Sequence, residues 1–208
     1  MRRYIRIGMQ HRPELDRWIL QAVGTPTSLL DLGCGVGRNA YLLWEDDVVG
    51  LRTGIEVDAG YLEKARQLGL YHGLIRGDLA QDLPARSKSF DVVLCTQVLG
   101  LLDKAAGVRL LEECERVAVE RVVISVQVGN DLRTRQGSWE NDRSIWTPAE
   151  LRHRGYTVQG FGSGFSRSRH GGRRFLYGFY LGTLLAQTWD RFAEEILCVR
   201  ELTAPERS

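Results

Sequence analysis

The sequence predicts an α/β fold in three layers, with helices on both faces of a mostly parallel, seven-stranded sheet. Short β-branched runs alternate with helical patterns between residues 28 and 127, at the pitch of βαβ units. Hydrophobic residues make up 43% and charged residues 26% of the chain, a composition typical of globular proteins and not of disordered ones. We find no internal repeat or linker, so we expect the 208 residues to form a single domain.

The predicted strands are short apolar runs bounded by turn residues. In chain order they cover residues 28–32, 52–57, 72–76, 89–95, 121–127, 156–161 and 195–201. The predicted helices show apolar residues at helical spacing. They cover residues 12–23, 37–44, 59–68, 109–117 and 175–189, with a short one after Thr147.

Local signals justify several of these boundaries. Pro13 suits the first turn of the leading helix. Thr147 and Glu150 have the spacing of a capping box, and Gly155 is placed to end the short helix that follows. The nearly apolar stretch 175–189 is shorter than the roughly 20 residues that span a bilayer, so we expect a buried covering helix.

Charge, cysteines and the first residues exclude several classes of protein. The formal net charge is only +2, which argues against a polycation that coats nucleic acid. The four cysteines are far apart, so neither a disulfide framework nor a metal site is predicted. No apolar run follows the basic start, as a signal peptide requires, and we expect a cytoplasmic protein.

The strongest local motif is a strand that runs into a glycine-rich turn and then a helix, over residues 29–39. Its glycines are Gly33, Gly35 and Gly37. Glycine allows positive φ and close approach of a ligand to the backbone, and the helix start presents free amides. A tight turn without a ligand would also explain the motif. Dinucleotide-binding folds need a glycine at position 38, which is Arg38 here, so an NAD-dependent oxidoreductase is disfavoured.

Two acids follow the next strands: Glu56 at the end of the second and Asp78 just after the third. Each alone could be a solvated strand-end residue. Ligands of open α/β sheets bind outside the carboxyl ends of the strands, where both acids and the glycine turn are expected. With this glycine spacing, the three features resemble the class I S-adenosylmethionine-dependent methyltransferases, in their small-molecule, type 11-like branch.

The resemblance implies a strand order of 3-2-1-4-5-7-6 with an antiparallel last strand. It implies S-adenosylmethionine as cofactor and S-adenosylhomocysteine as product, with Glu56 on the ribose hydroxyls and Asp78 on the adenine amino group. The other residues expected to bind the cofactor are Asp31, Gly33, Cys34, Gly35, Arg38, Val57, Leu79, Cys95 and Thr96.

The segment after the fourth strand bears on the methyl acceptor. Here it reads Cys95-Thr96-Gln97, without the Asp/Asn-Pro-Pro-aromatic sequence of enzymes that methylate amino groups of DNA bases, so DNA is not an expected partner. It also lacks the acids that aminopropyl transfer needs. No catalytic base is assigned. His72 lies at the wrong end of the third strand and His153 on the short helix.

Arginines gather toward the carboxyl-terminal part of the chain. Seven of them, and a single acid, lie between residues 143 and 174. We expect the sixth strand to run parallel to the first five, so that the loops after the fifth and sixth strands emerge beside the cofactor. A small anionic acceptor is therefore predicted, although a solvated basic loop would leave the same pattern. The residues expected near the acceptor are His11, His170, Arg173 and Arg174.

Segment 1–27 is expected to be a helical cover, and 129–147 and 162–192 insertions on the substrate side. Other functions stay open: a scaffold that binds the cofactor without turnover, or a methyltransferase acting on RNA or on a membrane lipid. A basic patch before the apolar stretch 175–189 could rest on an anionic membrane. The sequence predicts neither the oligomeric state nor whether O, N or C is methylated.

Overall fold

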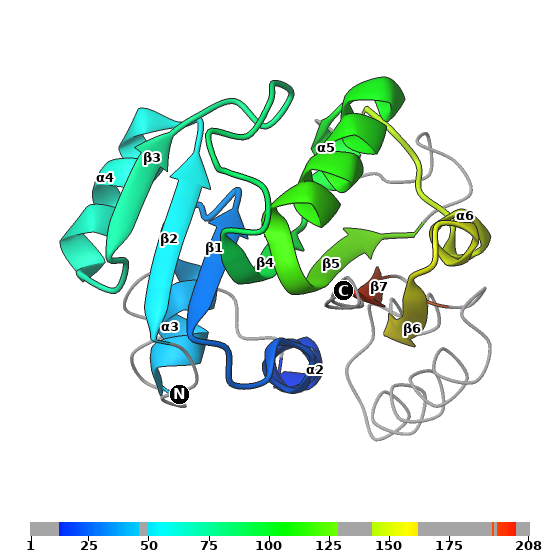
Figure 1. Ribbon diagram of the computed structural model, residues 1–208, viewed down its shortest axis with the longest axis horizontal. Coiled ribbons are helices and arrows are strands. Elements are labelled where there is room, and N and C mark those ends of the chain that lie inside the picture. Colours follow the sequence, from blue (N-terminus) through cyan, green and yellow to red (C-terminus); the bar gives the residue numbers. More distant parts are fainter. Residues whose placement is uncertain (1–12, 46–49, 129–142, 162–192, 194, 203–208) are drawn as a thin grey trace, which may run out of the picture.

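A computed structural model describes residues 13–45, 50–128, 143–161, 193 and 195–202. Within them seven strands form one sheet in the order β3-β2-β1-β4-β5-β7-β6 (Figure 1). The strands are β1 (Ser28–Leu32), β2 (Leu51–Glu56), β3 (Gly73–Arg76), β4 (Phe90–Thr96), β5 (Ala118–Gln127), β6 (Thr157–Phe161) and β7 (Glu195–Glu201). The helices are α2 (Pro13–Val23), α3 (Arg38–Glu45), α4 (Ala59–Leu68), α5 (Lys104–Val117) and α6 (Pro148–His153), with a short 3₁₀ turn, η1 (Leu99–Leu101).

The strand directions agree with the prediction. Strands β3, β2, β1, β4 and β5 pair in parallel, whereas β7 is antiparallel to both β5 and β6. Strand β6 consequently runs in the same direction as β5. The predicted order, the antiparallel last strand and the parallel sixth strand are all confirmed. The carboxyl ends of β1 to β5 therefore share one edge of the sheet.

Two hydrophobic cores lie on the two faces of the sheet. Leu30 and Leu32 pack in one core with residues of α5, whereas Leu29 packs in the other with residues of α2 and α3. Adjacent residues of a strand point to opposite faces, so β1 contributes to both cores. The three predicted layers are therefore confirmed.

The helix boundaries follow from capping. Asp58 accepts a hydrogen bond from Tyr61 N at the start of α4, and this helix has the predicted bounds. The predicted capping box of α6 forms between Thr147 and Glu150. Helix α5 begins at Lys104, five residues before the predicted start, because Asp103 caps it by accepting from Ala106 N at 2.9 Å.

Strand β5 begins directly after α5, at Ala118, three residues before its predicted start. The predicted helix 175–189 lies outside the described residues, as do most of the segments expected to cover the substrate side. Among the described helices, none combines the length and apolar character needed to cross a membrane.

Candidate functional site

The glycine turn after β1 is held against the end of β2. Gly33 N and Cys34 N both donate to Ile55 O, at 2.9 and 3.0 Å. Gly33 has φ +67°, and a Cβ at this position would stand 2.4 Å from Val98 Cγ2. Gly35 has φ +54°, but among the described residues no atom beyond its chain neighbours lies within 4 Å of its would-be Cβ. The turn is thus packed on the Gly33 side and open on the Gly35 side, where a ligand can approach the backbone.

Glu56 is the acid nearest to this open side. Its carboxylate accepts from Gly35 N and from Asp58 N, both at 2.9 Å. The side chain is buried, and two amides orient it at the end of β2. A carboxylate offers about four acceptor positions, so two remain for ligand hydroxyl groups.

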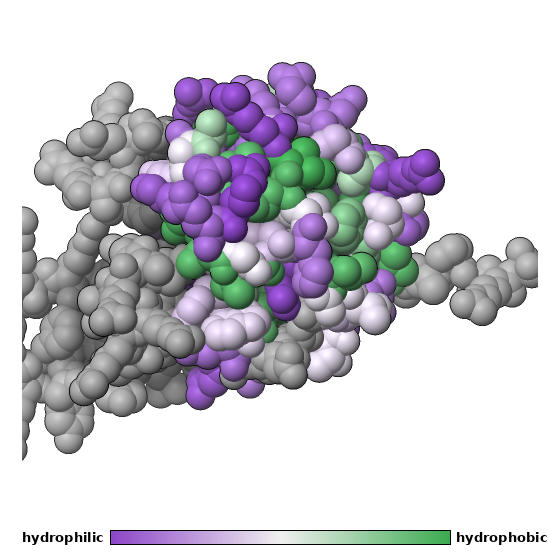
Figure 2. Space-filling model, turned by 90° about the vertical axis from the view of Figure 1, so that its left-hand side faces the viewer, coloured by the Kyte–Doolittle hydropathy of each residue, from purple (hydrophilic) through white to green (hydrophobic). Residues whose placement is uncertain are grey.

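Asp78 and Leu79 follow β3, the neighbour of β2. The exposed Asp78 accepts from Ala80 N at 2.9 Å, whereas Leu79 is buried. Val57 follows Glu56 and is 56% exposed, an apolar surface at the same edge. Hydrophobic residues also reach the surface at the end of the molecule formed by β3 and α4 (Figure 2). An apolar wall beside a free carboxylate fits a flat base that carries an amino group.

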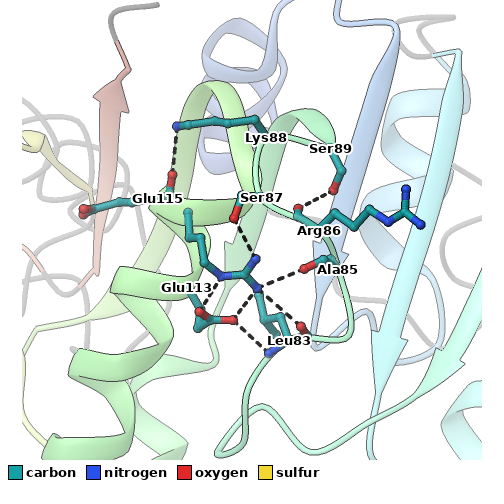
Figure 3. Close-up of polar contacts among 9 residues, drawn as sticks. Leu83, Ala85, Arg86, Ser87, Lys88, Ser89, Glu113 and Glu115 are labelled. Atoms are coloured by element: carbon teal, nitrogen blue, oxygen red, sulfur yellow. Dashed lines mark hydrogen bonds and ion pairs between the residues drawn. The ribbon is translucent and has the colours of Figure 1, made fainter. Parts of the chain in front are cut away.

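An ion pair on α5 fixes the loop that carries Asp78 and Leu79. Arg116 Nε and Nη2 donate to the two carboxylate oxygens of Glu113, at 2.6 and 2.7 Å. The same guanidinium donates to Ala85 O and Ser87 Oγ, and Leu83 N donates to Glu113 (Figure 3). Hydrogen bonds from Arg116 lower the pKa of Glu113, which keeps this carboxylate charged. The loop between β3 and β4 is therefore tied to α5 along its middle.

Asp31 lies beneath the glycine turn and is fully buried. Tyr71 Oη donates to one of its carboxylate oxygens at 2.6 Å, and Asn39 Nδ2 to the other at 3.0 Å. Asn39 Nδ2 also donates to Thr96 Oγ1 at 2.9 Å, which links β1, α3 and the end of β4. The side chains of Asp31 and Thr96 are thus bonded to protein groups, and these bonds join the elements that lie beneath the glycine turn.

Burial raises the pKa of Asp31 to about 6, against the hydrogen bonds from Tyr71 and Asn39. Between the unfolded value of 3.8 and the folded value of about 6, the folded protein holds more protons than the unfolded chain. The stability contributed by Asp31 is complete below pH 3.8 and is lost as the pH rises through about 6.

We expect the free energy of unfolding of wild type, relative to Asp31→Asn, to fall by about 2 kcal/mol between pH 4 and pH 7. Denaturant unfolding of both proteins across this range measures the difference. The variant has no carboxyl to titrate, so other groups cancel in the comparison. A difference that does not change with pH would contradict the raised pKa.

The remaining predicted cofactor residues occupy different surroundings. Arg38, the first residue of α3, forms an ion pair with Asp16 of α2. Cys34 is buried in the turn, and burial raises the pKa of its thiol. Cys95 is buried in the core together with Cys114.

The histidines and arginines predicted near the acceptor lie outside the described residues: His11, His170, Arg173 and Arg174. His72 Nδ1 accepts from Arg52 N, just before β3 and far from the carboxyl ends of the strands, as predicted. His153 ends α6, also as predicted.

Sequence reasoning missed several residues around the site, chiefly Tyr71, Asn39, Trp146 and the Gln97–Glu195 contact. Tyr71 is 40 positions from Asp31, and no motif connects them. Trp146 is fully buried, and its indole Nε1 donates to Leu99 O at 3.2 Å and to Ser144 Oγ at 2.9 Å. It thereby fixes the segment after β4. Only the apolar character of Trp146 and its place before a capping box could have suggested a structural role.

A seven-stranded sheet of this order, with a glycine turn after β1 and acids after β2 and β3, defines a class I methyltransferase fold. Comparison with known proteins agrees. Residues 30–124 match the family model described as a methyltransferase domain, of type 11. The match covers the part of the chain that carries the glycine turn and both acids, and the sheet has the fold of the class I S-adenosylmethionine-dependent methyltransferases.

Individual relatives are more distant. A 16S rRNA (guanine(1405)-N(7))-methyltransferase of Proteus mirabilis is 28% identical over an alignment of 143 residues, which covers 62% of this chain and 50% of that protein. The chain thus spans about half the length of the curated relative that it matches. The structure of a SAM dependent methyltransferase from Archaeoglobus fulgidus gives a TM-score of 0.64 at 15% identity, covering 91% of each chain.

The [4+2]-cyclase SpnF gives a TM-score of 0.62 at 18% identity, covering 92% of this chain and 82% of that one. At such identities the likeness to these structures concerns the fold alone.

Proposed function

We propose that this protein transfers a methyl group from S-adenosylmethionine to a small acceptor that carries an anionic group, releasing S-adenosylhomocysteine. One observation carries the proposal. Glu56 and Asp78 lie at the ends of the adjacent strands β2 and β3, and Glu56 is bonded to the amide of Gly35, on the open side of the glycine turn. Two carboxylates at adjacent strand ends suit the ribose hydroxyls and the adenine amino group of a nucleoside, and Arg38, at the position of the third glycine of dinucleotide-binding turns, disfavours a dinucleotide.

Each of these residues would have a definite role. Glu56 would accept from the ribose hydroxyls, and Asp78 from the adenine amino group. Val57 and Leu79 would offer apolar contacts to the base. When bound, the cofactor would supply an electrophilic methyl carbon to a lone pair of the acceptor, and the electrons of the sulfur–carbon bond would remain on the sulfur of S-adenosylhomocysteine. The protein would contribute mainly by holding acceptor and methyl in line.

The anionic character of the acceptor is supported by arginines. Arg143 N donates to Gly100 O at 2.7 Å, and the residue is exposed. This hydrogen bond holds the backbone of Arg143 beside the segment that follows β4. We propose, from the sequence, that Arg173 and Arg174 also bind the anionic group of the acceptor. A guanidinium binds a carboxylate or phosphate through two parallel hydrogen bonds.

A cytoplasmic location is supported by the free thiols of all four cysteines.

RNA is the second candidate acceptor, because the curated relative is named as an rRNA methyltransferase. A scaffold that binds the cofactor without turnover is the third alternative. The fold itself does not decide between them, since a [4+2]-cyclase has a similar structure.

Calorimetric titration with S-adenosylhomocysteine tests the site. We expect wild type to bind and Glu56→Gln to bind at least about tenfold more weakly, because an uncharged amide is a poorer acceptor for hydroxyl groups. Glu63→Gln on exposed α4 removes the same charge elsewhere and is expected to bind like wild type. Equal affinity in all three proteins would refute the assignment of Glu56.

Transfer of a labelled methyl group then tests the acceptor. We expect turnover of small carboxylic acids and none of their uncharged amides. Transfer to rRNA alone would favour the second candidate, and cofactor binding without transfer to either class would favour the scaffold.

A further inference from the structure

A polar cluster lies at the carboxyl end of β4, on the side of β1 away from Glu56 and Asp78. It consists of Gln97, Ser125 and Glu195, which come from the end of β4, from β5 and from the start of β7. Gln97 Nε2 donates to Ser125 Oγ at 3.2 Å and also to the Glu195 carboxylate. Glu195 is only 2% exposed, so a buried acid is directed at the residue that follows β4.

The backbone of Gln97 is held in an uncommon conformation. Its φ is +60°, a left-handed value that costs a residue with a Cβ about 1 kcal/mol or more. Gln97 N donates to Ser125 O at 2.9 Å, which fixes the residue against β5. Next to it, Val98 packs on Gly33 of the glycine turn. A strained residue held between the turn and a buried acid is typical of a functional position.

The partners of Gln97 determine which way its carboxamide faces. The amide nitrogen is the atom that meets both the Glu195 carboxyl group and Ser125 Oγ. Both nitrogen hydrogens are then used, one by Glu195 and one by Ser125. Among the described residues, no group donates to Gln97 Oε1. The cluster thus presents one oriented acceptor atom at the edge where ligands bind.

We propose that Gln97 contacts the methyl acceptor and selects one whose reacting atom carries a proton, an O–H or N–H group that donates to Gln97 Oε1. Glu195 is the positioning residue that keeps this oxygen directed at the acceptor. The inference rests on the proposed function and adds the chemical class of the reacting atom. Methylation of such an atom releases its proton, which passes to water because a carboxamide is not a base at neutral pH.

The first test compares two sets of small carboxylic acids with tritium-labelled S-adenosylmethionine. One set carries a phenol or a secondary amine, and the matched set carries a thioether or a tertiary amine, which have a lone pair but no proton. We expect the proton-bearing acids to react with a kcat/KM at least about tenfold higher, because the unprotonated ones leave Oε1 unpaired.

Variants separate this role from a structural one. Gln97→Ala is expected to raise the KM of a proton-bearing acid about tenfold, the loss of one hydrogen bond, while the affinity for S-adenosylhomocysteine stays within about twofold. Gln97→Glu places two carboxylates together and is expected to lose at least as much. The double variant Gln97→Glu/Glu195→Gln exchanges the partners and still presents an oxygen, so its KM should return toward wild type. Ser125→Ala removes a single partner and should have a smaller effect.

The possible failures are distinguishable. Absence of S-adenosylhomocysteine binding would refute the proposed function. With binding intact, the inference is overturned by equal turnover of the two sets, by an unchanged KM in Gln97→Ala, by a double variant no better than Gln97→Glu, or by no turnover of either set.

Discussion

Replacing Trp146 with alanine is expected to lower the free energy of unfolding by about 3–5 kcal/mol, the largest single effect that we expect. The indole is fully buried against α5 and bonded to Leu99 O and Ser144 Oγ. Lys104 Nζ lies 3.6 Å from the ring centroid and donates to Ile145 O and Glu150. Truncation would leave a cavity and a cation without its aromatic partner.

Gly107 offers a matched control for the packing of Trp146. A Cβ at Gly107 would stand 2.6 Å from Trp146 Cζ2. In wild type, Gly107→Ala is therefore expected to destabilise by about 1–3 kcal/mol through overpacking. In the Trp146→Ala background the same change should stabilise by up to about 1 kcal/mol, because alanine favours a helix. Denaturant unfolding of wild type, the two single variants and the double variant completes the double-mutant cycle. If Gly107→Ala destabilises both backgrounds, the two residues are not in contact.

Gly33→Ala is the second substitution for which we expect a large loss of stability. The left-handed φ and the 2.4 Å approach to Val98 Cγ2 each make alanine unfavourable there, by about 1–3 kcal/mol apiece. We expect a lower melting temperature together with loss of affinity for S-adenosylhomocysteine, since the turn and the segment after β4 must both shift.

Gly35→Ala separates folding from binding. Its φ is similar, but in the described part of the chain only its neighbours in sequence come near its would-be Cβ, so we expect a smaller loss of stability than in Gly33→Ala. Its cofactor affinity should nevertheless fall by at least about tenfold, because the methyl group occupies the space left for the ligand. Calorimetry and thermal unfolding of the two variants provide the comparison. Wild-type affinity in Gly35→Ala would mean that no ligand approaches the turn from its open side.

Local patterns were sufficient for the layers of the fold and for most elements. Helix α4 has its predicted bounds, and the capping box of α6 forms as Thr147 and Glu150 predict. The start of α5 was missed because the apolar spacing begins later than the helix, whose first turn depends on the Asp103 cap.

The residues of the candidate site also divide into those whose placement the sequence predicts and those whose contacts it does not. Glu56 and Asp78 were predictable because parallel strands bring their carboxyl ends to one edge, so that sequence order alone places the acids together. The contacts of the Asp31 and Cys95 side chains were not predictable, since a strand position does not reveal which groups pack over a side chain. Asp31 turned out to be bonded to Tyr71 and Asn39, and Cys95 to lie beside Cys114.

By itself the sequence determined the alternation of strands and helices, the glycine turn and the two acids that follow β2 and β3. These features depend on backbone conformation and on hydrophobic periodicity, which act over a few residues. Only the tertiary structure decided that Gln97 meets Glu195, 98 positions away, and that Trp146 holds the segment after β4. Such contacts form when the packed sheet brings β7 and the segment before α6 against β4 and β5, and no local pattern encodes that approach.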